Sequence, residues 1–169
     1  PQQVAESAEA LAGRIGQSQM VVIPGGFSGG DEPEGSAKLI NAFFRGPQVA
    51  QAVTELLEAR DGMVVGICNG FQALIKLGPF PHGKITSVTA DSPTLTLNAI
   101  GRHQSMLVRT RVASNLSPWL CREEVDAIHT VAVSHGEGRF VADEAVLEQL
   151  ASAGQIATQY VGFDGAPTL

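Results

Sequence analysis

The sequence has little of what secreted and membrane proteins depend on. Its 169 residues include two cysteines, Cys68 and Cys121, which are too few for a disulfide framework. No apolar run approaches the length of a membrane span. The first residues, Pro-Gln-Gln-Val-Ala-Glu, have neither the basic region nor the apolar region of a secretory signal. These absences favour a protein of the reducing cytoplasm.

Clusters of basic residues are also missing. The chain has 11 Lys and Arg residues against 17 Asp and Glu residues, which gives a formal charge of −6. This balance argues against nucleic acid or an anionic membrane as the main partner. The chain instead has 44% hydrophobic residues, 19 glycines and nine prolines, a profile typical of soluble α/β proteins with many tight turns. Its length suits a single domain over residues 1–169.

Periodic apolar residues and short apolar runs predict the secondary structure. Helices are expected over residues 2–14, 36–44, 47–60, 69–77 and 143–153. Strands are expected over residues 20–23, 63–67, 87–89, 94–97, 106–112, 128–133 and 155–161. Together they predict an open, mostly parallel sheet with helices on both faces and some added antiparallel strands, which are expected between residues 79 and 117. Asp164-Gly165 signals a turn, but too few residues follow it for a further strand.

The most informative stretch runs from Met63 to Leu74, where a short apolar run stops at a cysteine and a helix-forming run begins. Its segment Gly-Ile-Cys68-Asn-Gly has the spacing of a nucleophile elbow, with cysteine in the place of the more familiar serine. Glycine suits both flanks because the turn brings the backbones of strand and helix close together. A helix N-terminus also stabilises a thiolate. Cys68 is therefore predicted to be a nucleophile, and a buried structural cysteine is the alternative.

A thiol nucleophile needs backbone donors for an oxyanion and a base for its proton. Gly25, Gly26 and Phe27 follow the neighbouring strand, and with the N–H of Asn69 they are candidates for the oxyanion hole. A plain tight turn is the alternative for this glycine pair.

Of the four histidines, only His135 is expected at the carboxyl end of a strand, where its side chain would reach the elbow. The logic of catalytic triads makes His135 the base and Glu137 its orienter. A His-x-Glu pair in a loop also arises without catalysis.

Two charged groups have simpler interpretations than binding sites. Asp31, Glu32 and Glu34 are better explained as solvated loop acids than as metal ligands, so no metal is expected. The basic residues of segment 102–111 fit a solvated strand face better than a phosphate or docking patch.

Three segments in this order carry a specific resemblance: Pro24-Gly-Gly-Phe-Ser-Gly-Gly-Asp31, Gly66-Ile-Cys-Asn-Gly-Phe-Gln72 and Ser134-His-Gly-Glu-Gly-Arg-Phe140. The chain resembles the glutaminase domain of phosphoribosylformylglycinamidine synthases, a group of class I (triad) glutamine amidotransferases. The resemblance implies a flavodoxin-like sheet and hydrolysis of glutamine through a cysteine thioester. It also implies that the ammonia passes to an ATP-dependent synthetase region in purine synthesis. No cofactor is expected in the domain itself, whereas ATP and Mg are expected in the synthetase.

The same resemblance assigns roles to residues of this chain. Cys68 matches the nucleophile, while Gly26, Phe27 and Asn69 match the oxyanion and glutamine-carbonyl region. Gln72 matches a residue that contacts glutamine. The strand-end segment that holds the amino and carboxylate groups of glutamine in class I domains corresponds here to Ser134, His135, Gly136 and Glu137.

The resemblance further leads us to expect a domain that is incomplete at both ends. The family domain opens with a strand that is missing here, and its catalytic His and Glu lie in a segment near the C-terminus that this chain does not contain. We therefore expect little or no turnover by these 169 residues alone, with His135 as the only alternative base. Exposed strand edges make self-association plausible. The competing hypotheses are a cysteine hydrolase of the DJ-1/PfpI type and a non-catalytic docking domain that uses segment 102–111.

Overall fold

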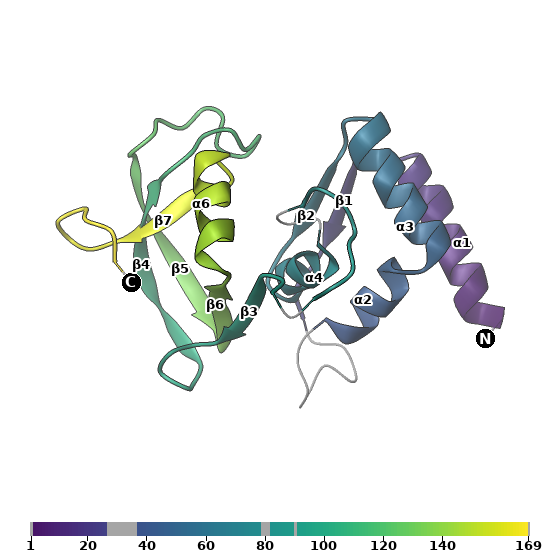
Figure 1. Ribbon diagram of the computed structural model, residues 1–169, viewed down its shortest axis with the longest axis horizontal. Coiled ribbons are helices and arrows are strands. Elements are labelled where there is room, and N and C mark those ends of the chain that lie inside the picture. The colour runs from purple at the N-terminus through teal and green to yellow at the C-terminus, as the bar shows by residue number, and fades with distance from the viewer. Residues whose placement is uncertain (1, 27–36, 79–81, 90, 169) are drawn as a thin grey trace. The chain divides into compact units, whose positions relative to one another are not determined.

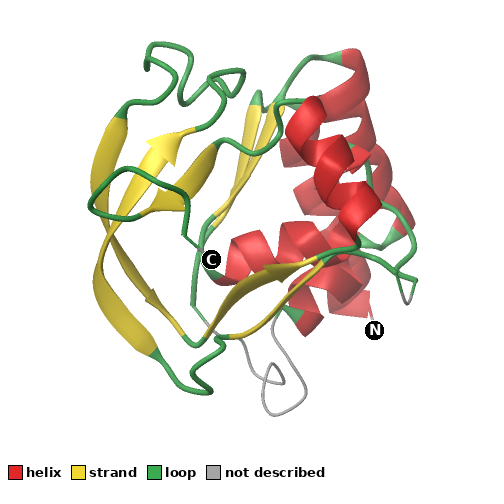
Figure 2. Cartoon of the chain, turned by 60° about the vertical axis from the view of Figure 1, so that its left-hand side comes forward, coloured by secondary structure: helices red, strands yellow, loops and turns green. Residues whose placement is uncertain are grey.

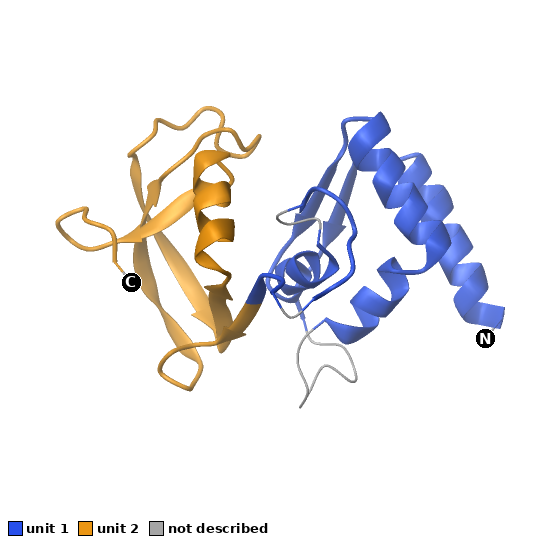
Figure 3. Cartoon of the chain, in the orientation of Figure 1, with its two compact units in different colours: residues 1–94 blue, residues 95–169 orange. Residues whose placement is uncertain are grey.

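The structure is a computed structural model that describes residues 2–26, 37–78, 82–89 and 91–168. The chain divides into two compact units, unit 1 over residues 1–94 and unit 2 over residues 95–169 (Figure 3). The chain contains both helices and strands (Figure 2), and each unit has elements of both kinds, so the predicted α/β class is confirmed. The single-domain organisation stays a prediction.

Unit 1 is built from helices around one parallel strand pair (Figure 1). Its elements are α1 (Gln2–Gly16), β1 (Met20–Ile23), α2 (Lys38–Phe44), α3 (Pro47–Thr54), the π-helical turn η1 (Glu55–Ala59), β2 (Met63–Gly66) and α4 (Asn69–Leu77). β1 and β2 pair in register from Met20 opposite Met63 to Ile23 opposite Gly66. Because the strands are parallel, the loops after Ile23 and after Gly66 leave the same edge of the pair.

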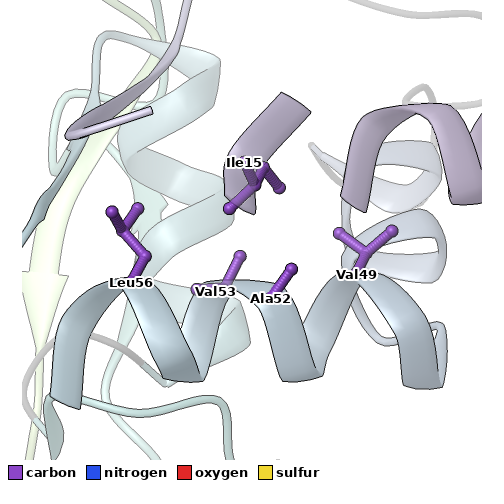
Figure 4. Close-up of a cluster of buried hydrophobic side chains, with 5 residues drawn as sticks. All are labelled: Ile15, Val49, Ala52, Val53 and Leu56. Atoms are coloured by element: carbon purple, nitrogen blue, oxygen red, sulfur yellow. The ribbon is translucent and has the colours of Figure 1, made fainter. Parts of the chain in front are cut away.

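The core of unit 1 lies between α1 and the continuous helix formed by α3 and η1. Its buried residues, drawn in Figure 4, are Ile15, Val49, Ala52, Val53 and Leu56. The spacing of Val49, Val53 and Leu56 places all three on one helical face, as the sequence predicts. Strand β1 departs from the prediction of a buried strand, since Ile23 is buried but the side chain of Val22 is 51% exposed.

Arg60, which follows η1, caps the C-terminal end of α1. Its guanidinium donates hydrogen bonds to the carbonyl oxygens of Ile15 (2.8 Å), Gly16 (3.1 Å) and Ser18 (2.8 Å). The carbonyls of Ile15 and Gly16 lie at the negative end of α1, where they have no partner within the helix, and Ser18 follows in the turn. Arg60 therefore ties α1 to the segment that leads into β2.

Arg60→Ala is expected to lower the free energy of unfolding by about 1–2 kcal/mol, because charge-assisted bonds to helix-end carbonyls are lost. Urea denaturation followed by circular dichroism measures the change. Arg14→Ala removes a cation from the same helix end and is expected to change stability by less than about 0.5 kcal/mol. Equal effects of the two substitutions would contradict the capping role of Arg60.

Unit 2 is dominated by antiparallel strands. Its elements are β3 (Thr94–Leu97, which begins at the last residue of unit 1), β4 (Gln104–Val112), β5 (Ile128–His135), β6 (Glu137–Val141), α6 (Glu144–Ser152) and β7 (Thr158–Val161). β4 lies between β5 and β7 and pairs antiparallel with both. β3 pairs with β6 in a separate sheet. Gly154 follows α6 with φ +66°, in agreement with its predicted place at the helix end.

Three predictions about the strands need correction. The described strands form three small sheets. The β1–β2 pair is parallel and the three-stranded sheet is antiparallel, so a mostly parallel sheet is not seen among the described residues. Segment 87–89 is described and contains no strand. The turn at Asp164-Gly165 does lead into a return segment, because Val161 forms an antiparallel bridge with Pro167 and the Thr168 N–H donates to the Tyr160 carbonyl at 3.0 Å.

Candidate functional site

The backbone at Cys68 has the geometry of a nucleophile elbow. Cys68 lies between β2 and α4 with φ 54° and ψ −115°, a conformation that residues with a side chain rarely adopt. A Cβ on Gly66 would come within 2.5 Å of the Gly70 carbonyl oxygen, and a Cβ on Gly70 would collide with the Ile23 carbonyl oxygen. The two glycines are thus required by the close approach of strand and helix, as predicted.

The thiol of Cys68 is exposed at the N-terminus of α4. The alternative of a buried structural cysteine is therefore wrong. Within the part of the chain that the structure describes, the Sγ atom has no hydrogen-bond partner. The thiol is open to a reactant, and its backbone is held in place by the elbow.

The Gly25-Gly26 turn lies directly against the elbow. A Cβ on Gly25 would stand 2.9 Å from the Cys68 Cβ and 3.6 Å from its Sγ, and Gly26 has φ +101°. The side chain of Asn69 is fully buried and donates from Nδ2 to the Gly26 carbonyl at 2.9 Å. The structure therefore brings Gly25, Gly26 and Asn69 to the nucleophile. Phe27, also predicted here, lies outside the described residues.

Gln72 follows the nucleophile by one helical turn. Its N–H donates to the Cys68 carbonyl at 3.1 Å, and its side chain is buried. Gln72 therefore lies beside the elbow. Its contact with glutamine stays a prediction.

Cys68→Gly is expected to raise the free energy of unfolding by about 1 kcal/mol. Backbone strain at a non-glycine residue in this conformation costs about 1–3 kcal/mol, which glycine relieves. The larger conformational entropy of glycine in the unfolded chain offsets about 0.5–1 kcal/mol of that stabilisation. Chemical denaturation measures the change, with Cys68→Ala as the control that keeps the strain. Equal stability of the glycine and alanine variants would show that the elbow is not strained.

The second group of predicted site residues, Ser134 to Glu137, joins β5 to β6 in unit 2. The Ser134 hydroxyl lies 2.9 Å from His103 Nε2. The His135 Nδ1 atom lies 2.8 Å from Oδ1 of Asn98, and the Gly136 carbonyl accepts from the Asn98 N–H at 2.9 Å. The ring of His135 is therefore oriented by Asn98 and not by Glu137, which corrects the triad-like interpretation of this pair.

Asn98 and the contact of His103 with Ser134 were missed by sequence reasoning. Asn98 is 37 residues from His135 in sequence, so no local periodicity links the two. The available sequence signal was an asparagine directly after the predicted strand 94–97, with Gly101 shortly after it. In the structure Gly101 has φ +67°. Cys68 belongs to unit 1 and His135 to unit 2, and their union in one site stays a prediction.

Two arginines of segment 102–111 form hydrogen bonds or ion pairs within unit 2. Arg109 donates to the carbonyls of Gly162 (3.2 Å) and Phe163 (2.8 Å). Arg111 forms an ion pair with Asp126 at 3.2 Å and donates to the Gln159 side chain at 2.8 Å. These contacts fasten β7 and the following turn, which favours a structural role over a phosphate or docking patch.

Neither a metal site nor a membrane segment is found in the described residues. No group of three or more potential metal ligands occurs among them. The loop acids Asp31, Glu32 and Glu34 lie outside the described part. None of the helices in the described part is long and apolar enough to cross a membrane.

Comparison with known proteins identifies the family. The family model of the CobB/CobQ-like glutamine amidotransferase domain matches residues 3–169. The chain belongs to this family. The match includes the elbow, the Gly25-Gly26 turn and segment 134–137, and the roles predicted for these residues stay predictions.

Two relatives of this amidotransferase domain are both named phosphoribosylformylglycinamidine synthase subunit PurQ. The protein of Symbiobacterium thermophilum is 35% identical over 148 residues, which cover 88% of this chain and 56% of the relative. The protein of Mycobacterium tuberculosis is 40% identical over 142 residues, which cover 83% of this chain and 55% of the relative. The chain thus spans slightly more than half the length of these relatives.

A solved structure, that of PurLQS from Thermotoga maritima, has a similar fold. The TM-score is 0.62 at 24% sequence identity, and the match covers 86% of this chain and 57% of that chain. The similarity supports the mixed α/β fold of the amidotransferase domain.

Proposed function

We propose that this domain hydrolyses the side-chain amide of glutamine through a thioester on Cys68. The observation that carries the proposal is the exposed Cys68 thiol in a strained elbow, at the N-terminus of α4 and against the Gly25-Gly26 turn. Family membership and the names of the relatives favour glutamine as the substrate. We also propose that the complete domain has a flavodoxin-like sheet.

In the proposed reaction, the Cys68 thiolate attacks the amide carbon of glutamine and forms a tetrahedral intermediate. Its oxyanion accepts hydrogen bonds from the Asn69 N–H and the glycine turn. The carbon–nitrogen bond breaks, ammonia leaves with the proton taken from the thiol, and a glutamyl thioester remains. Water then cleaves the thioester to glutamate and restores the thiol. Gln72 and segment 134–137 hold the amino-acid part of the substrate.

The ammonia serves an ATP-dependent synthetase that converts formylglycinamide ribonucleotide to its amidine. This partner is proposed from the synthase named in the relatives. ATP and Mg belong to that synthetase, and the amidotransferase domain needs no cofactor of its own. We place the reaction in the cytoplasm. Self-association of the isolated domain through open strand edges belongs to the same set of proposals.

We expect residues 1–169 alone to turn over glutamine very slowly, because no described side chain donates to or accepts from the Cys68 thiol. Nucleophilic cysteines of this kind depend on an adjacent base. Steady ammonia release by the purified chain, abolished by Cys68→Ala, would contradict this expectation. It would also restore His135 as the candidate base.

Labelling with a chloroketone analogue of glutamine tests the proposed function. We expect the analogue to alkylate Cys68 at least about tenfold faster than Cys121, since one specific binding contact is equivalent to roughly that factor. Both thiols are exposed, so Cys121 serves as the internal control. Peptide mass spectrometry locates the label, and excess glutamine should protect Cys68 only. Equal labelling of both cysteines, unaffected by glutamine, would contradict a glutamine site.

A further inference from the structure

Asn98 contacts the segment that joins β5 to β6 through its backbone N–H and through both polar atoms of its side chain. The Asn98 side chain is buried, with 8% of its surface exposed. Its backbone N–H donates to the Gly136 carbonyl at 2.9 Å, and its Nδ2 donates to the His135 carbonyl at 2.7 Å and to the Arg102 carbonyl at 3.1 Å. Its Oδ1 lies 2.8 Å from the His135 Nδ1. One side chain thus contacts both the backbone and the ring of His135.

These contacts determine which ring nitrogen of His135 carries the proton. The carbonyls of His135 and Arg102 only accept hydrogen bonds, so the atom that faces them must be the amide nitrogen of Asn98. The atom that faces Nδ1 is then the amide oxygen, which also only accepts. Nδ1 must therefore be the donor of the 2.8 Å bond. In the neutral ring the remaining lone pair lies on Nε2.

The Nε2 lone pair of His135 is available to a ligand. Among the described residues, Nε2 has no hydrogen-bond partner. His135 also lines a groove of about 460 Å³ in unit 2, together with Gln104, Met106, Arg109 and Tyr160. The ring is packed close to Gly138, where a Cβ would collide with it. The imidazole therefore has a fixed orientation and a free acceptor.

We propose that Asn98 is a positioning residue that fixes His135 in its Nδ1-protonated tautomer, so that Nε2 accepts a hydrogen bond from an N–H group of the ligand. The choice of ligand, the ammonium group of glutamine, rests on the proposed function. The tautomer itself follows from the contacts of Asn98 alone. Asn98 touches no reacting atom, and its effect reaches the ligand only through the ring and backbone of His135.

Nitrogen-15 NMR of the ring tests the tautomer directly. Long-range proton–nitrogen correlations at alkaline pH distinguish a protonated Nδ1 from a protonated Nε2, and the variant His135→Gln assigns the signals. We expect His135 to be Nδ1-protonated in the unmodified chain. A His135 signal with the proton on Nε2, or with both tautomers averaged, overturns the proposal without any variant of Asn98.

Variants of Asn98 separate positioning from general stability. Asn98→Ala is expected to shift His135 toward a mixture of tautomers. Asn98→Asp keeps an acceptor opposite Nδ1 and is expected to retain the tautomer. Asn115→Ala is the matched control, because Asn115 also donates to a backbone carbonyl in unit 2, that of Glu123 at 3.2 Å, but forms no hydrogen bond with a described histidine. An unchanged tautomer in folded Asn98→Ala, or loss of the tautomer in folded Asn98→Asp, overturns the proposal.

Calorimetry with glutamine tests the choice of ligand separately. We expect Asn98→Ala to weaken glutamine binding about tenfold, the equivalent of one hydrogen bond, and Asn115→Ala to leave it unchanged. If the unmodified chain has the expected tautomer but does not bind glutamine, the result counts against the proposed function. It then overturns the choice of ligand and leaves the tautomer assignment standing. Unweakened binding by folded Asn98→Ala would overturn the link between the tautomer and the ligand.

Discussion

Gly70→Ala is expected to destabilise unit 1 strongly. The added Cβ would collide with the Ile23 carbonyl oxygen and stand close to the Ile23 Cβ. This carbonyl accepts the hydrogen bond from the Ile67 N–H at 3.0 Å, so it cannot move away without breaking the link between β1 and the elbow. We expect a loss of about 3 kcal/mol or more in the free energy of unfolding, a large part of the stability of a typical domain. Circular dichroism and urea denaturation measure it.

Gly13→Ala is the matched control for this substitution. Gly13 lies in α1, and a Cβ there would have no heavy atom within 4 Å. Alanine in an open helical position is expected to stabilise by up to about 1 kcal/mol. A Gly70→Ala variant as stable as the unmodified chain would show that strand and helix are not in close contact at the elbow.

Leu56→Ala is expected to lower the free energy of unfolding by about 2–5 kcal/mol. Leu56 is completely buried in the core between α1 and the α3–η1 helix. Its side chain also covers Gly62, where a Cβ would collide with it, so the segment leading into β2 packs on the same leucine. Removal of its methyl groups leaves a cavity that neighbouring elements cannot fill without moving. Urea denaturation of the variant measures the loss.

Leu39→Ala makes the same chemical change on the surface of α2, where Leu39 is 57% exposed. It is expected to change stability by less than about 1 kcal/mol, since most of the side chain is already in water. If both leucine substitutions had the same effect, Leu56 would not be the centre of the core.

The features that depend on local backbone geometry could be predicted from the sequence. The elbow requires glycine at two positions around Cys68 because backbone atoms come into contact there, and this requirement is visible as a short motif. The helical face of Val49, Val53 and Leu56 follows from the 3.6-residue period in the same way. Both depend on residues that are only a few positions apart in the sequence.

Strand pairing was predicted less well because it depends on distant partners. Segment 87–89 has a favourable composition, but the Thr89 N–H donates to the Ser92 hydroxyl at 2.9 Å, and this local bond competes with a sheet partner. The antiparallel direction expected for segment 106–112 is found in β4, but β5, which was expected in the parallel part of the sheet, also pairs antiparallel. These strands are joined by residues 113–127, in which no helix occurs, and such a connection permits antiparallel pairing.

The partners of the second group of site residues could not be predicted from sequence spacing. Neither composition nor spacing indicates that Asn98 meets His135, because the two residues are brought together by the pairing of different strands. The His-x-Glu spacing instead suggested the wrong orienter. Triad-like sequence spacing is therefore a weak guide when the acceptor comes from another strand.

The bond from the Asn69 side chain to the Gly26 carbonyl has a consequence for slow motions of the domain. It joins the first residue of α4 to the turn after β1, and the Ile67 N–H joins the same two loops through Ile23. Opening of either loop must break both bonds, so the two loops open together. Hydrogen exchange should accordingly report one shared opening rate for the amides of Ile67 and Gly70. The elbow that carries Cys68 and the Gly25-Gly26 turn would then unfold and refold together.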